Sequence, residues 1–236
     1  REVSRQLSEF RHQFLLFTPQ VSSVEVDDDV AGVASRWRAS RENLDVGASR
    51  VTLQGRETTE TWVVVHTAHT PSEAAMADAG TVHARSKINV SWAVRGDRGA
   101  HDRTSLGLWN FFPTSTPMTI PGIVNAPFKM NDDRMSVLDD LYNVEILRHA
   151  LPRLILFAVP HLRTPNDPAA HLSVAPARGR EDVPWIGEGV IMPLNEVLAS
   201  VPYVPDLAGD LRTISELRVR PDVRPDEIED VDAWLE

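Results

Sequence analysis

The chain has 236 residues, of which 42% are hydrophobic and 25% charged, a composition typical of a globular protein of one large domain or two small ones. Its net charge of −10 argues against a broad nucleic-acid surface and against binding to an anionic membrane surface, because both depend on basic residues. The absence of cysteine excludes disulfides, thiolate metal sites and cysteine nucleophiles, and we expect a cytoplasmic location.

The N-terminal part is predicted to hold a helix and a short strand. Apolar residues recur at helical spacing in residues 1–20, and Pro19 closes that segment. VSSVEVDDD (21–29) predicts a strand that ends in an acidic turn, and the polar sequence RASRENLDVGAS (38–49) is expected to be a loop. The chain begins without Met, so we expect a piece of a longer protein or a processed one.

From about residue 50 the hydrophobic period changes to two. SRVTLQGR (49–56) and TETWVVVHTA (59–68) predict a pair of strands, followed by a short helix over PSEAAMADAG (71–80). KINVSWAVRG (87–96) and SLGLWNFFPT (105–114) predict two more strands, the second central and covered on both faces. Four residues of the first pair are expected to face a core: Val51, Leu53, Trp62 and Val64.

Helices dominate the second half. A helix is expected from about Asp132, broken or kinked at Pro152, with RLILFAV (153–159) continuing as a buried helix or strand. Residues 160–184 are expected to be a loop, and residues 185–202 a strand and then a helix. Early hairpins and late helices together indicate an α+β fold with a mixed or antiparallel sheet and helices on one side.

The histidines do not form a recognisable metal or catalytic motif. His66 and His69 are three apart on a predicted strand, so they point to opposite faces, and a shared metal would need a turn there. We interpret them as structural or surface residues, and a metal-dependent hydrolase stays as an alternative. The sequence contains no Gly-x-Ser-x-Gly elbow and no phosphate-binding glycine loop, so no catalytic residue and no metal ligand is assigned.

One lysine has an unusual position. WNFFPTSTPMTIPGIVNAPFKMNDDR (109–134) carries one of only two lysines in a chain with 22 arginines, a bias that we attribute to genomic base composition. Lys129 precedes the predicted helix start, where free backbone N–H groups favour anions. Asn125 would brace the loop, and Arg134 would contact the same anion. The alternative is an ordinary salt bridge from Lys129 to Asp132 or Asp133, which the residues alone favour.

Two sequences resemble a known family. LSEFRHQFLLFTPQVSSVEVDD (7–28) and the pattern FPT…PG…VNAPF…NDDR followed by LDDLYNVEIL resemble the region after the ATPase domain of sacsin-like proteins, relatives of the ninety-kilodalton heat-shock chaperone among the GHKL ATPases. The resemblance implies a transducer or middle domain with a left-handed βαβ crossover, against the usual handedness. It also implies that a basic loop residue, Lys129 first and Arg134 second, reaches the γ-phosphate of ATP.

The chain also departs from that family. The magnesium-binding Asn helix, the Asp-x-Gly-x-Gly sequence and the glycine-rich lid are missing from residues 1–236, so we expect a non-catalytic fragment without its own cofactor. ATP and Mg²⁺ would come with an upstream ATP-binding domain of the same chain, and a full-length ATPase could act on a protein client.

The expected organisation is the end of the upstream domain or a connecting segment (1–30), a transducer-like domain (31–215), and an acidic linker or the start of the next segment (216–236). The alternative is an acidic interaction module that docks a partner through the proline-rich residues 113–127, with no nucleotide role.

Overall fold

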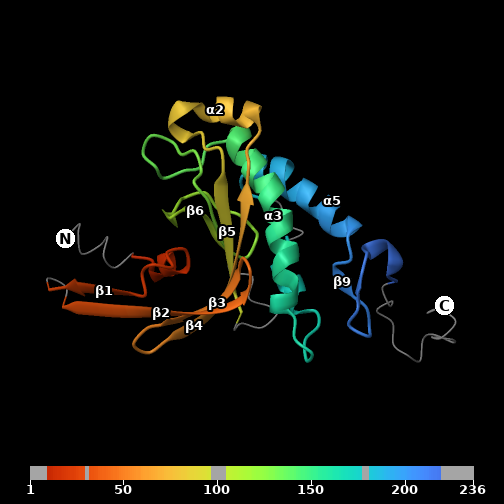
Figure 1. Ribbon diagram of the computed structural model, residues 1–236, viewed down its shortest axis with the longest axis horizontal. Helices are drawn as coiled ribbons and strands as arrows, with labels where there is room; N and C mark the ends of the chain where they lie inside the picture. The colour runs from red at the N-terminus through yellow and green to blue at the C-terminus, as the bar shows by residue number, and fades with distance from the viewer. Residues whose placement is uncertain (1–9, 30–31, 97–104, 177–180, 219–236) are drawn as a thin grey trace.

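The computed structural model describes residues 10–29, 32–96, 105–176 and 181–218, and its centre is one mixed β-sheet (Figure 1). The sheet has eight strands in the order β1-β2-β3-β4-β5-β8-β6-β7. Neighbours pair antiparallel except β6 and β8, which are parallel. In chain order the strands are β1 (Ser23–Asp28), β2 (Val33–Asp45), β3 (Ala48–Gln54), β4 (Thr59–His69), β5 (Ile88–Arg95), β6 (Ser105–Asn110), β7 (Phe112–Pro113) and β8 (Gly122–Asn125).

The helices follow or interrupt these strands. The α-helices are α2 (Glu73–His83), α3 (Leu141–Leu162), α4 (Pro184–Ile186) and α5 (Met192–Ser200), with a π-helical turn η3 (Gly187–Ile191) between the last two. Short 3-10 turns are η1 (His12–Leu16), η2 (Ala170–Val174) and η4 (Ile214–Glu216), and a small ribbon pairs β9 (Val204–Pro205) with β10 (Leu211–Arg212). Within the described ranges, no helix combines the length and apolar character that crossing a membrane requires.

The α-helices cover one face of the sheet (Figure 1). Strand side chains alternate between faces, so Val63 and Val65 on β4 and Trp92 on β5 point together toward α3. They pack with the buried stripe of α3, which includes Tyr142 and Ile146. The prediction of an α+β fold with helices on one side of a mostly antiparallel, mixed sheet is therefore confirmed.

The opposite face is covered by the N-terminal segment. Leu15 and Leu16 on η1 are buried against the four residues that the sequence assigned to a core: Val51, Leu53, Trp62 and Val64. That assignment is confirmed. Because β1 pairs with β2, the predicted boundary at residue 30 falls between two neighbouring strands of one sheet. Residues 1–9 of the predicted first helix and residues 219–236 of the predicted linker lie outside the described residues.

Three sequence predictions were wrong, each for a local reason. Residues 38–49 are not a loop but the turn and flanking parts of β2 and β3, polar because one face of this hairpin is exposed. The helix predicted from Asp132 begins at Leu141, because Asp140 caps it by accepting from the backbone N–H of Asn143 at 2.8 Å. Residues 153–159 belong to the same helix, which is one of the two alternatives that the sequence left open for them. The strand predicted at the start of residues 185–202 is helical, through the π-turn of η3.

The strand predicted over residues 105–114 is only partly as expected. Leu108 and Trp109 on β6 are buried on opposite faces, which confirms coverage from both sides. Phe111 and Phe112 are exposed instead, because Phe111 takes a left-handed conformation (φ 62°) that ends the strand. The βαβ crossover implied by the resemblance is not found among the described residues, since the parallel pair β6–β8 is joined by residues 111–121, which contain β7 and no helix.

Candidate functional site

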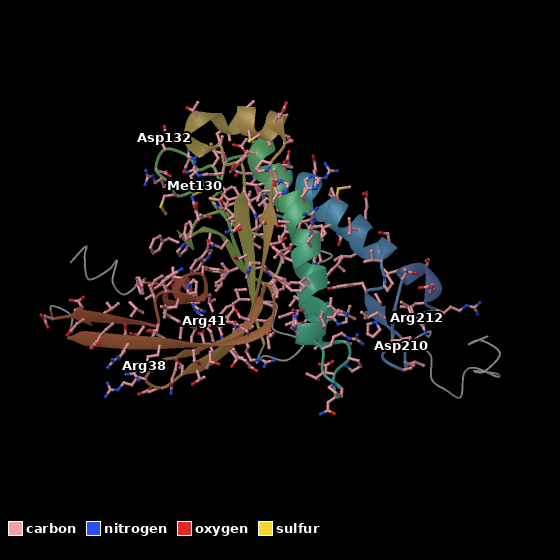
Figure 2. All side chains as sticks on the ribbon, viewed as in Figure 1. Arg38, Arg41, Met130, Asp132, Asp210 and Arg212 are labelled. Carbon is pink, nitrogen blue, oxygen red and sulfur yellow. The ribbon has the colours of Figure 1, made fainter. Side chains whose placement is uncertain are left out.

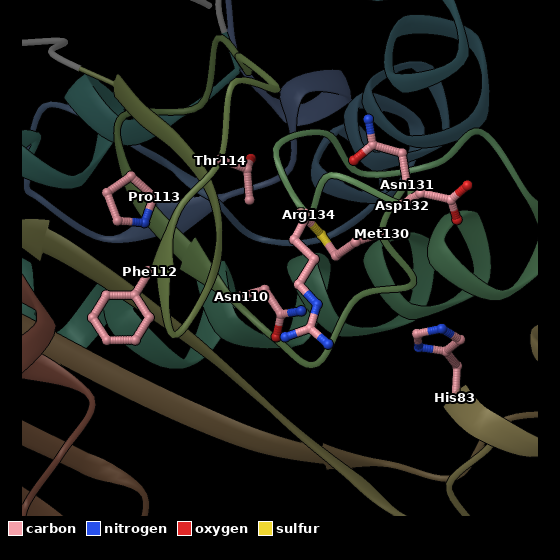
Figure 3. Close-up of a pocket in the computed structure, with 9 residues that line it drawn as sticks. All are labelled: His83, Asn110, Phe112, Pro113, Thr114, Met130, Asn131, Asp132 and Arg134. Carbon is pink, nitrogen blue, oxygen red and sulfur yellow. The ribbon is translucent and has the colours of Figure 1, made fainter.

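A pocket of about 550 Å³ opens where residues 109–134 meet the end of α2 (Figure 3). Asn110, Phe112 and Thr114 line it from β6, β7 and the following turn, and His83 closes one side from α2. The loop of residues 130–134 forms the remaining wall, and Figure 2 places Met130 and Asp132 on this loop beside α2. Its size lies within the range of small-ligand sites, about 300–1,000 Å³.

The loop that carries Arg134 is fixed by its own hydrogen bonds. Asn131 Oδ1 accepts from the backbone N–H groups of Met135 (3.1 Å) and Ser136 (3.0 Å), and the N–H of Arg134 donates to the Asn131 carbonyl at 3.0 Å. Asp133 Oδ1 also accepts from Met135 at 2.7 Å. This turn places Arg134 in the left-handed region with φ 59°, an uncommon conformation for a residue with a side chain. The backbone thereby directs Arg134 into the pocket.

Arg134 is the basic side chain of this pocket. It is exposed and makes no ion pair or hydrogen bond from its side chain to any residue that the structure describes. Figure 3 shows its guanidinium group pointing toward Asn110, while the carboxylate of Asp132 lies at the other side of the pocket. A guanidinium without a counter-charge can bind a carboxylate or phosphate in a bidentate manner.

Lys129 lies outside this pocket and is already paired. Its Nζ is 3.2 Å from Asp140 Oδ2 and 4.0 Å from Asp78 Oδ2, and it donates to the Asp78 carbonyl at 2.7 Å. The lysine therefore ties α2 to the N-terminus of α3. The salt bridge weighed from the sequence exists, but its partners are Asp78 and Asp140 rather than Asp132 or Asp133. The phosphate role of Lys129 stays a prediction.

Asn125 holds the turn at Phe111 and lines another pocket. Its Oδ1 accepts from the backbone N–H of Phe111 at 2.8 Å. The residue ends β8, is buried, and lines a second pocket of about 530 Å³ together with Phe111 on the face that η1 covers. The three residues chosen from the sequence are thus not gathered at one site: Arg134 lines the first pocket, Asn125 the second, and Lys129 neither.

The two histidines point to opposite faces of β4, as predicted. His69 is buried beside α3, with its Nε2 3.0 Å from Glu145 Oε1, and His66 is exposed on the other face. Ser72 donates to Glu145 and accepts from Ala75, so the carboxylate lies at the centre of the cluster rather than at the end of a serine–histidine–acid relay. Among the described residues no group of side chains is arranged to hold a metal ion.

Hydrogen bonds set the protonation of Glu145. Burial alone would raise the pKa of Glu145, but the hydrogen bonds from Ser72 and His69 outweigh it and lower the pKa below the usual glutamate value. The carboxylate thus stays ionised and joins β4, the start of α2 and α3. This cluster is a structural clamp.

Sequence reasoning missed Asn110 and Thr114, which line the first pocket. Both have structural partners, since the amide of Asn110 donates to the Phe128 carbonyl at 3.2 Å and the Thr114 hydroxyl donates to the Leu108 carbonyl at 2.7 Å. The density of prolines and turn residues between 113 and 122 indicated an irregular segment here. Nothing local indicated that this segment would meet α2.

Comparison with protein-family models, curated proteins and solved structures gave no match.

Proposed function

We propose that the chain is a non-catalytic transducer or middle-domain fragment of a sacsin-like GHKL-type ATPase, and that Arg134 offers its charge to the γ-phosphate of ATP held by an upstream domain. One observation carries the choice of residue: Arg134 lines an open pocket without an ion pair among the described residues. Lys129 is the first choice by sequence, but it would have to leave two carboxylates to reach a phosphate.

In this proposal the upstream domain binds the nucleotide, and this chain contributes the arginine. Residues 1–236 lack the nucleotide-pocket sequences, so ATP and Mg²⁺ would be held by the upstream domain, and the fragment would be inactive alone. A fixed arginine that meets the phosphate only when the domains close would couple nucleotide state to domain angle. We place this activity in the cytoplasm, which agrees with the lack of cysteine.

The test is ATP hydrolysis by the longer protein that includes the preceding ATPase domain. Arg134→Met should reduce kcat about a hundredfold, because arginines that contact a transferring phosphoryl group contribute at least that much. Lys129→Met is the matched control, which should weaken the α2–α3 contact and leave kcat within about threefold of wild type. Full activity of Arg134→Met, or no hydrolysis by the longer protein, contradicts the proposal.

An interaction module with no nucleotide role is the second candidate, and three exposed apolar side chains favour it. Phe111, Phe112 and Met135 are 51%, 61% and 54% exposed. Exposed large apolar side chains are typical of protein-docking sites. The same assay separates the two functions, because a docking module predicts unchanged hydrolysis for Arg134→Met and Lys129→Met alike.

A further inference from the structure

The second pocket lies on the face of the sheet that η1 covers, and its floor is polar. Register pairs His66 on β4 with Ser91 on β5, and Ser91 with Asn125 on β8. Directly opposite residues in antiparallel strands place their Cβ atoms about 5 Å apart on the same face. Three polar side chains therefore form one row across three strands, and Asn89 and the Asn43–Ser49 pair extend it toward the rim.

The hydrogen-bonding groups of this floor are largely unused. The side chains of His66, Ser91, Asn89, Asn43 and Ser49 make no hydrogen bond to any residue within the described ranges. Asn125 uses its Oδ1 for the Phe111 N–H and leaves its amide N–H₂ group available. A solvated strand face commonly carries such groups, but here they line a concave site of about 530 Å³ and can converge on one ligand.

The walls are apolar and held in place. Phe17, Pro19, Phe111 and Pro127 contribute apolar lining. Arg41 donates from Nη2 to the Leu15 carbonyl, which ties η1 to β2 (Figure 2). The segment that follows η1 is thereby fixed over the sheet as part of the built pocket.

The charges of the pocket favour a neutral ligand. Its lining includes one arginine, Arg41, and one aspartate, Asp45, so the formal charges cancel. Arg41 is engaged with the Leu15 carbonyl, and Asp45 Oδ1 accepts from the Val46 N–H at 2.6 Å. The nearby carboxylate of Asp45 opposes the binding of an anion here, unlike at Arg134. The remaining amides and hydroxyls both donate and accept, which matches ligand hydroxyl groups.

We propose that this pocket binds a neutral polyhydroxylated ring, a mono- or disaccharide unit, with the hydroxyls on the His66–Ser91–Asn125 row and the C–H face of the ring against Phe17 or Phe111. The proposal is independent of the nucleotide role, because Arg134 lines the other pocket. The aromatic side chains would make the apolar contact with the sugar ring, and hydrogen bonds from the His66–Ser91–Asn125 row would orient its hydroxyl groups.

The test is saturation-transfer NMR on the 236-residue chain with maltose, lactose and sucrose as probes, and with adenosine and inorganic phosphate for comparison. At least one disaccharide should receive saturation from the wild type. Ser91→Val should weaken that binding about tenfold, because it removes one hydrogen-bonding group and narrows the floor. Ser40→Ala, on the other face of β2, is the matched control and should bind like the wild type.

Circular dichroism shows whether Ser91→Val is folded. If it is not, His66→Ala replaces it, since His66 is exposed and its side chain has no partner in the described part of the chain. The proposal is overturned if no disaccharide receives saturation, if only adenosine or phosphate does, or if the floor variant binds as tightly as the wild type.

Discussion

At the scale of single residues, Asn143 fixes the segment that connects the first pocket to α3. Its side chain is fully buried, accepts from the Lys129 N–H at 2.9 Å, and donates to the carbonyls of Lys129 (2.8 Å) and Leu138 (2.9 Å). One amide thus satisfies backbone groups that an irregular segment cannot pair by itself. The position of Lys129 depends on this contact as much as on its ion pairs.

Asn143→Ala should lower the free energy of unfolding by about 3 kcal/mol, because it leaves the part-buried N–H of Lys129 and carbonyl of Leu138 unsatisfied, while the Lys129 carbonyl keeps the Leu138 N–H at 3.1 Å. Urea unfolding at neutral pH measures the change. Asn89→Ala is the control, since Asn89 is exposed and its side chain has no described partner, and it should stay within about 0.5 kcal/mol of wild type. Equal losses in the two variants would show that the Asn143 hydrogen bonds contribute little.

The sequence singled out residues 109–134, which contribute most of the first pocket, but it ranked Lys129 above Arg134 as the basic residue of the site. From the sequence, Asp132 and Asp133 were the expected partners of a Lys129 salt bridge, but the turn at Asn131 separates Lys129 from them. Two distant acids, Asp78 and Asp140, bind it instead. The left-handed conformation of Arg134 has no reliable sequence signal in a residue other than glycine. Pairings between distant residues become visible only in the fold.

At the scale of elements, the clamp of Ser72, His69 and Glu145 joins three of them. Both the N–H and the hydroxyl of Ser72 donate to Glu145, and the same hydroxyl accepts from the Ala75 N–H as the cap of α2. His69 binds the same carboxylate from β4. The pKa of Glu145 is lower in the folded protein than the usual glutamate value. The stability that Glu145 contributes is therefore fully present above the usual glutamate pKa, and it is lost as the pH falls through the lower pKa of the folded protein.

Glu145→Gln should therefore reduce the stability of the protein at pH 7 and make its loss of stability between pH 7 and pH 3 smaller than in the wild type. Urea midpoints at both pH values give the comparison. Glu196→Gln, an exposed position on α5 without an ion pair to any described residue, should keep the wild-type acid dependence. A parallel loss in Glu145→Gln and the wild type would exclude the clamp as a source of acid sensitivity.

Strands were predictable from the sequence where every second residue is apolar and those residues form the buried face. The strands over 49–56 and 59–68 were found because one side of each packs on η1. The outer part of β2 has no such signal, since its polar residues serve an exposed face. The start of α3 was misplaced because the sequence offers two aspartate pairs, at 132–133 and at 139–140, and tertiary contacts select the second.

At the scale of the whole molecule, Gly122 lies where the antiparallel strands meet the parallel pair. Its φ is 89°, and a Cβ atom built there would lie 2.1 Å from the carbonyl oxygen of Ala93 on β5. Strand β8 pairs with β5 on one side and β6 on the other, so the close approach at Gly122 holds the two parts of the sheet together.

Gly122→Ala should lower the free energy of unfolding by at least about 2 kcal/mol, through backbone strain and the collision with Ala93. Gly80→Ala tests strain alone, because Gly80 also has a positive φ (71°) but has no atom within 4 Å of the added methyl group. It should cost about 1 kcal/mol. If thermal unfolding shows equal losses for the two variants, the approach of β8 to β5 is looser than the structure indicates.

The fold class followed from the sequence because local periodicity determines which elements exist. The pockets did not follow, because both are built between elements that are distant along the chain. The polar floor had a partial signal: Trp62, Val64 and His66 change from apolar to polar along one strand face. The strand register, which places His66 beside Ser91 and Ser91 beside Asn125, brings the polar side chains together, and the sequence does not reveal that register.

Phe111, whose backbone is left-handed, and its neighbour Phe112 line different pockets. Phe111 lines the pocket with the polar floor, and Phe112 lines the pocket of Arg134, with its ring 6.3 Å from that of Phe14 on η1. The two cavities therefore share one peptide unit as a common wall, with Asn125 as its anchor. A substitution that displaced this peptide unit would therefore change the shape of both cavities at once.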